Sequence, residues 1–188
     1  MSFATRARTA VRKAKKNGLS VHWASSHSDW EQFGQLYSSR MAELNAATEY
    51  LYSTEYFERL ANWPNAKLLM CFDNDELVAG SVFLFTPDYC EYHLSASTAT
   101  GMKNAATQLI IYEAGLECQK QQVKYMHLGG GLSNSESDAL LFFKSGFSEL
   151  TAKFYVVNWL FDTEKYLRLK AQYEASGKPT NRVLFYRS

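Results

Sequence analysis

Hydrophobic and polar positions along the chain predict helices and strands in a defined order. Apolar residues recur close to every 3.6 positions between Trp30 and Leu44, which is typical of an amphipathic helix. Three short apolar runs over 67–72, 76–85 and 89–96, separated by turn residues, predict an antiparallel meander. The other expected helices are 3–16, 54–63, 104–121, 138–145 and 163–175, and the other expected strands are 19–24, 124–128, 151–161 and 183–186.

Local signals mark where several of these helices begin and end. Asn17-Gly18 ends the first helix, and Pro64 stops the helix over 54–63. Because Ser28 stands three residues before Glu31, we expect a capping box at the start of the long helix. No repeat or linker divides the 188 residues. We therefore expect one domain over 1–188, with a basic helix over 1–18 and a helix and short strand over 162–188.

Composition and charge exclude several classes of protein. The net charge is +1, so no overall field draws the chain to nucleic acid or to a membrane. The three cysteines, Cys71, Cys90 and Cys118, have no CxxC spacing, which predicts neither a metal site nor a disulfide framework. No signal peptide and no integral membrane segment is expected, because no apolar run approaches the roughly 20 residues that span a bilayer. A cytoplasmic location fits these features.

The element order resembles the GNAT fold, an α/β (α+β) fold with a mixed, mainly antiparallel central sheet and helices on both faces. Within that superfamily the sequence resembles the Fem-type aminoacyl/peptidyl transferases and related envelope-polysaccharide acyltransferases. The most specific segment is Leu128-Gly-Gly-Gly131 to Asp138, followed by Phe142-Phe-Lys-Ser-Gly-Phe147. The other segments are Arg8 to Gly18, Leu36 to Met41 with Tyr56-Phe57, and Tyr92 to Ser97.

The resemblance implies transfer of an acyl or aminoacyl group to an amine, on a peptidoglycan or cell-envelope glycan precursor. The donor would be acyl-CoA or aminoacyl-tRNA, and the acceptor a small molecule or a lipid-linked glycan. The chain has room only for the second GNAT-like domain of a Fem-type enzyme. An acetyl-CoA-dependent small-molecule N-acetyltransferase is one alternative. A non-catalytic GNAT-like binding module, or half of a homodimeric transferase, is another.

The candidate donor site lies in two glycine-containing loops. Gly129, Gly130 and Gly131 follow a predicted strand, where glycines let the backbone approach a phosphate or carboxylate, although a mobile turn is the other interpretation. Of the usual GNAT pyrophosphate loop, only Gly101 and Lys103 remain. Asp138 is expected at a helix N-terminus, with a substrate contact as a second role.

Four residues are candidates for catalysis. By resemblance, Phe143 and Lys144 lie near the donor end of the site, and Phe142 stands where many GNAT enzymes have a tyrosine general acid. His93 is a candidate general base and Glu91 an alternative base, since strand alternation puts both on one polar face with Ser95. A hydrogen-bonded structural histidine is the competing interpretation of His93.

The candidate acceptor side lies at the N-terminal helices. Arg8 and Arg12 are spaced to bind phosphates of a nucleotide-sugar, lipid-linked precursor or tRNA, although a solvated charged helix explains them too. Tyr37 and Arg40 are expected to line the acceptor side, and core packing explains Tyr37 equally well.

Overall fold

The computed structural model describes residues 3–133, 135, 137–178 and 183–187. It divides into two compact units, Met1–Glu149 and Leu150–Ser188, which are described separately. The single domain that the sequence predicts over 1–188 stays a prediction.

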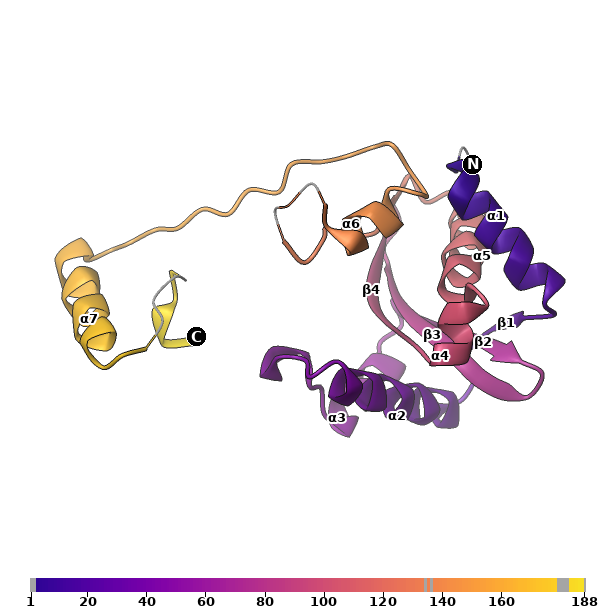
Figure 1. Ribbon diagram of the computed structural model, residues 1–188, viewed down its shortest axis with the longest axis horizontal. Helices are drawn as coiled ribbons and strands as arrows, with labels where there is room; N and C mark the ends of the chain where they lie inside the picture. The colour runs from indigo at the N-terminus through magenta and orange to yellow at the C-terminus, as the bar shows by residue number, and fades with distance from the viewer. Residues whose placement is uncertain (1–2, 134, 136, 179–182, 188) are drawn as a thin grey trace. The chain divides into compact units, whose positions relative to one another are not determined.

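A five-stranded sheet forms the centre of the first unit (Figure 1). Its strands lie in chain order, and four of them, β1 to β4, are antiparallel neighbours, whereas β5 runs parallel to β4. The predicted mixed, mainly antiparallel sheet is therefore confirmed. The bounds are β1 (Ser20–Trp23), β2 (Ala66–Asp73), β3 (Glu76–Phe85), β4 (Tyr89–Ser97) and β5 (Tyr125–His127).

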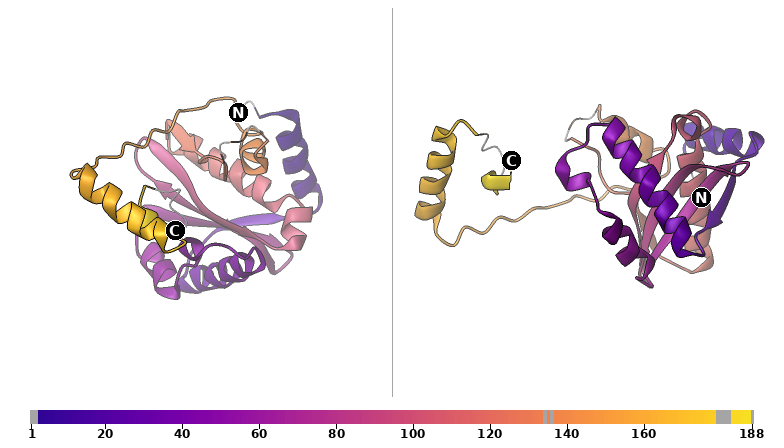
Figure 2. Two further views of the ribbon diagram at one scale, coloured as in Figure 1. Left: turned by 60° about the vertical axis from the view of Figure 1, so that its left-hand side comes forward. Right: turned by 90° about the horizontal axis from the view of Figure 1, so that it is seen from below.

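Helices cover both faces of this sheet, as the sequence predicts (Figures 1 and 2). On one face, α1 (Thr5–Lys16) and α5 (Ala106–Lys120) enclose a core that contains Phe83 and Ile110. On the other, α2 (His27–Glu43) and α3 (Thr54–Ala61) enclose an aromatic core around Phe33. A 3-10 turn, η1 (Thr48–Tyr50), lies between these two helices in the chain.

The start of α2 differs from the predicted capping box. The Ser26 hydroxyl accepts a hydrogen bond from the Asp29 N–H, and the Asp29 carboxylate accepts from the N–H groups of Ser25 and Ser26. These backbone donors lower the pKa of Asp29. The prediction of a capping box at Ser28 and Glu31 was wrong by two positions. The helix begins at His27, and Ser26 with Asp29 has the same Ser-x-x-acid spacing two residues earlier.

The helix expected over 104–121 is confirmed as α5, and a short helix that the sequence did not predict, α4 (Ala99–Lys103), precedes it and is separated from it at Ala105. Ala105 takes a left-handed conformation with φ of 60°, which an α-helix cannot continue through. The Thr98 hydroxyl caps α4 by accepting the Gly101 N–H at 3.1 Å.

A β-bulge in β4 changes the direction of its side chains. Val82 of β3 lies opposite Leu94, and the next residue, Phe83, lies opposite Tyr92, so His93 is the extra residue of the bulge. Ser95 pairs with Ser81 on the Tyr92 side, whereas His93 meets α3. The prediction that His93 and Ser95 share one face was therefore wrong, because regular alternation stops at the bulge.

The second unit is a small helical element. The Asp162 carboxylate caps α7 (Thr163–Ala175), and the ring of Phe185 packs between Tyr166 and Tyr173. The strand expected over 183–186 is absent from these described residues, where the 3-10 turn η2 (Phe185–Arg187) stands instead.

The strand predicted over 151–161 is also not formed, although every residue in that range is described. Its side chains are exposed, with Phe154 at 90% and Phe161 at 94% of their accessible surface. β-Branched and aromatic residues favour a strand, but a strand also needs a neighbour to pair its backbone groups. No described residue pairs with this segment as a strand.

Candidate functional site

The main feature of the candidate site is the place after Glu91 and His127 where β4 and β5 stop pairing, which we call the fork. The two strands pair only over three residues, and the last pair is Glu91 with His127. Beyond that pair, β4 has a strand partner only in β3, as far as the described residues go. The bulge at His93 lies two residues further on, and a bulge bends its strand and increases its twist. On the β5 side, β4 therefore has no strand neighbour beyond Glu91 within the described residues.

The glycine loop and Lys144 lie beside this fork. Gly129 follows β5 with φ of +74°, a conformation that favours glycine. The Lys144 ammonium, at the end of α6 (Ala139–Lys144), donates to the Gly130 carbonyl at 2.7 Å and lies 5.9 Å from the Tyr92 ring centroid. Burial lowers the pKa of Lys144, and Asp138 opposes that shift. The structure thus brings Lys144 and the glycine loop together next to β4.

Asp138 organises the same loop. Its carboxylate caps α6 by accepting the Leu141 N–H at 2.8 Å and also accepts the N–H groups of Leu132 and Ser133. These backbone donors lower the pKa of Asp138, which is only 8% exposed. A Cβ at Gly131 would overlap the Asp138 carboxylate, so a larger residue there would displace that carboxylate from its backbone donors. The predicted N-terminal role is confirmed, and a substrate contact stays a prediction.

The two aromatic residues of α6 have different surroundings, and Phe142 is 62% exposed. Phe143 contacts a small core cluster and makes an edge contact with Phe147, their centroids 5.5 Å apart. Phe142 lies under the Arg6 guanidinium, whose carbon is 4.1 Å from the ring centroid. Arg6 also donates to the Phe142 carbonyl and to the Ser145 hydroxyl. Part of the basic helix therefore holds α6 in place.

His93 is paired with a residue that the sequence did not single out as functional. The Tyr56 hydroxyl of α3 lies 2.6 Å from Nε2 of His93. Burial lowers the pKa of His93, with Glu91 opposing the shift, and burial raises the pKa of Tyr56. A neutral imidazole is therefore paired with a protonated phenol near pH 7. Tyr56 appears in the family-like segments, but nothing in the spacing of the two residues indicates this contact.

The remaining residues of the predicted donor site have other partners. Gly101 is buried, and a Cβ there would overlap the Val78 carbonyl, so this glycine serves close packing of α4 on β3. The Lys103 carbonyl accepts the Lys13 ammonium at 2.6 Å, and the Lys103 side chain is exposed. A contact of either residue with a donor stays a prediction.

The predicted acceptor residues are spread over α1 and α2. Arg8 donates to the Phe3 carbonyl and the Thr5 hydroxyl at the start of its own helix, and Arg12 is exposed. Arg40 pairs with Glu43 and contacts the Met102 sulfur of α4. Tyr37 is 3% exposed in the aromatic core, which agrees with the packing interpretation.

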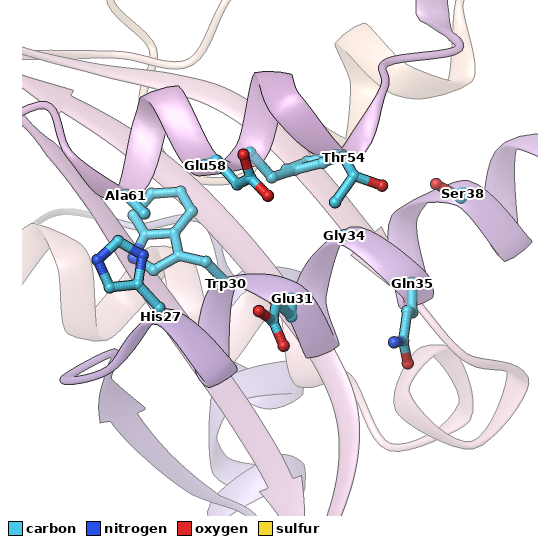
Figure 3. Close-up of a pocket in the computed structure, with 10 residues that line it drawn as sticks. His27, Trp30, Glu31, Gly34, Gln35, Ser38, Thr54, Glu58 and Ala61 are labelled. Atoms are coloured by element: carbon cyan, nitrogen blue, oxygen red, sulfur yellow. The ribbon is translucent and has the colours of Figure 1, made fainter.

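A cavity of about 280 Å³ lies between α2 and α3 (Figure 3). Trp30 and Phe57 supply apolar walls, and Glu31 and Glu58 come from opposite helices. Pattern analysis did not predict this cavity, because it forms only when the two helices pack together.

Two classes of feature are absent from the described part of the chain. No group of three or more His, Cys, Asp or Glu side chains is arranged to hold a metal ion there. Among the described helices, none has both the length and the apolar character needed to cross a bilayer.

Comparison with known proteins identifies a family. The model of the "Acetyltransferase (GNAT) domain" matches residues 1–136. A comparison with curated proteins finds no match.

Solved structures share the fold at low sequence identity. An aminoglycoside acetyltransferase from an uncultured soil metagenomic sample, in complex with sisomicin, superposes with a TM-score of 0.58 at 15% identity, over 78% of this chain and 97% of that one. The ribosomal-protein-alanine N-acetyltransferase of Brucella melitensis biovar Abortus 2308 gives 0.57 at 13% identity, over 75% and 99%. FemX gives 0.63 at 14% identity, over 77% of this chain and 53% of FemX.

Proposed function

Because this chain belongs to the GNAT acetyltransferase family, we propose that it transfers an acyl group from acyl-CoA to an amine of a small-molecule acceptor. The observation that carries this proposal is the fork between β4 and β5, with the neutral imidazole of His93 at the bulge beside it. Acyl transfer from a thioester requires a positioned amine, a base for its proton and donors for the developing oxyanion.

The residues of the fork fit the acyl end of such a donor better than its phosphates. Backbone N–H groups of β4 beyond Glu91 are available to bind the thioester carbonyl and to stabilise its oxyanion. The Gly101 N–H, by contrast, is already bonded to the Thr98 hydroxyl. We therefore assign the exposed Lys103 side chain to the donor's phosphates, and His93 to the amine proton.

A titration of the full chain with acetyl-CoA tests the donor. We expect one-to-one binding by calorimetry, weakened about tenfold in Lys103→Met because one charge-assisted contact is lost. Lys120→Met is the matched control, since Lys120 is an exposed lysine at the end of α5. Absence of binding to acetyl-CoA and to CoA would contradict the proposal and favour a non-catalytic module.

The second candidate is Fem-type aminoacyl transfer to a peptidoglycan or lipid-linked glycan precursor, with aminoacyl-tRNA as donor. The bond from Lys144 to the Gly130 carbonyl favours it, because the same loop and lysine carry the sequence resemblance. Binding of aminoacyl-tRNA in place of acetyl-CoA, with loss of that binding in Lys144→Met, would select this candidate.

We also propose that the chain forms a homodimer through residues 150–161. Phe154 and Val157 are 90% and 82% exposed, and exposed apolar segments of this kind mark interaction sites. By light scattering we expect a dimer that Phe154→Glu with Val157→Glu converts to a monomer. Leu132→Glu, at a residue of equal 82% exposure, should leave the dimer intact. A monomeric wild-type chain at all concentrations would contradict this proposal.

A further inference from the structure

The pair formed by Tyr56 and His93 has a geometry suited to proton transfer. The phenol oxygen and the imidazole Nε2 lie 2.6 Å apart, which is short for a hydrogen bond between these groups. His93 is the extra residue of the β4 bulge, and Tyr56 belongs to α3 on the adjoining face. The imidazole therefore faces α3, opposite the side of Tyr92, and the bulge places the next residue, Leu94, on the α3 side as well.

An aromatic stack holds Tyr56 in this position. Its ring lies flat on Tyr52, with centroids 4.2 Å apart and planes 15° apart, and Tyr52 in turn contacts the buried ring of Tyr37. Phe57 makes an edge contact with the Tyr56 ring at 5.8 Å. Neither Tyr56 nor His93 is fully buried. Packing therefore fixes the phenol ring while both members of the pair retain some exposure.

The tautomer of His93 sets the direction of the hydrogen bond. Burial keeps the imidazole neutral and the phenol protonated, so only one of the two groups has to donate. If the phenol donates to Nε2, the proton of the imidazole is on Nδ1, and the phenol oxygen keeps lone pairs for another donor. Glu91 is the nearby charge that stabilises an imidazolium.

We propose that the Tyr56 hydroxyl, with His93 behind it, is the group that takes the proton of the acceptor amine. This inference rests on the proposed acyl transfer and adds a catalytic residue to it. An ammonium group gives one proton to the Tyr56 oxygen as the phenol proton moves to Nε2, which leaves a neutral amine and an imidazolium. The amine nitrogen then bonds to the thioester carbon, the carbon–sulfur bond breaks, and the second nitrogen proton goes to the thiolate. Deprotonation of His93 by water completes the cycle.

The test combines kinetics with a direct measurement of the pair. In Tyr56→Phe, which keeps the ring stack and removes only the hydroxyl, we expect kcat/KM for acyl transfer to fall about 10²-fold or more. The double variant with His93→Ala should be no slower than His93→Ala alone within about threefold, because the two groups act as a unit. Tyr89→Phe is the matched control: it keeps the stack on Tyr125, and its activity should be unchanged.

Nitrogen NMR of the imidazole separates failure of this inference from failure of the proposed function. In the wild-type chain we expect His93 to carry its proton on Nδ1, with Nε2 as acceptor, and Tyr56→Phe should alter that pattern. A proton on Nε2 would overturn the relay whether or not the chain is active. If the wild-type chain is active and Tyr56→Phe keeps that full activity, the relay is also overturned. A chain with the expected tautomer but without any acyl transfer would overturn the proposed function and, with it, the catalytic role of the pair.

Discussion

Replacing His93 by alanine lowers kcat/KM for acyl transfer by about 10²- to 10⁴-fold, the range measured when a general base is removed. The loss is expected in kcat, because the imidazole is the final acceptor of the proton from the bound amine and does not hold the donor. His22→Ala is the control, since His22 is a histidine of β1 that packs against Phe72. Retention of more than about a tenth of the wild-type rate would contradict the assignment.

The pH dependence of the same reaction gives a second measurement. Burial lowers the pKa of His93, so the rate should fall only as the pH drops through a value below the ordinary pKa of histidine. The titratable groups that act on the imidazole are Tyr56 of α3 and Glu91 of β4. Because Glu91 raises the pKa of His93, Glu91→Gln should move the acid limb to still lower pH. If Glu91 were itself the base, that variant would instead lose most of its activity.

The sequence predicted the parts of the fold that depend on local patterns. Alternation and turn residues located β2, β3 and β4. The element order, with the segment from Leu128 to Phe147, indicated a GNAT family, which the match over residues 1–136 confirms. The prediction of a strand over 151–161 was wrong for a physical reason. Its residues favour an extended backbone, but strand formation is decided by a partner, and no single segment encodes whether a partner is present.

The candidate site was harder to predict because it depends on register. The bulge at His93 exists only through the way in which β3 and β4 pair, and one extra residue reverses the faces that alternation assigns. The contact with Tyr56 joins positions 37 residues apart, on a strand and a helix whose packing the pattern does not fix. The Asp138 cap, by contrast, was predictable because a helix N-terminus is a local feature.

Gly101→Ala tests whether this glycine serves packing or donor binding. The added Cβ would overlap the Val78 carbonyl and lie 2.5 Å from the Ser97 hydroxyl. The same carbonyl accepts the Thr98 N–H at 2.9 Å, which anchors the turn between β4 and α4. Backbone atoms cannot move aside as a flexible side chain does, so we expect the free energy of unfolding to fall by about 3 kcal/mol.

The measurement is the urea midpoint of the purified chain, with Gly130→Ala as the matched control. A Cβ at Gly130 meets nothing within 4 Å, so this substitution should change the free energy of unfolding by less than about 0.5 kcal/mol. If Gly101→Ala kept wild-type stability but lost affinity for acetyl-CoA, Gly101 would contact the donor, as the sequence predicts. If Gly101→Ala lowers the stability, and Lys103→Met weakens acetyl-CoA binding while the chain stays folded, the two residues have separate roles. Gly101 then shapes the turn, and Lys103 binds the donor.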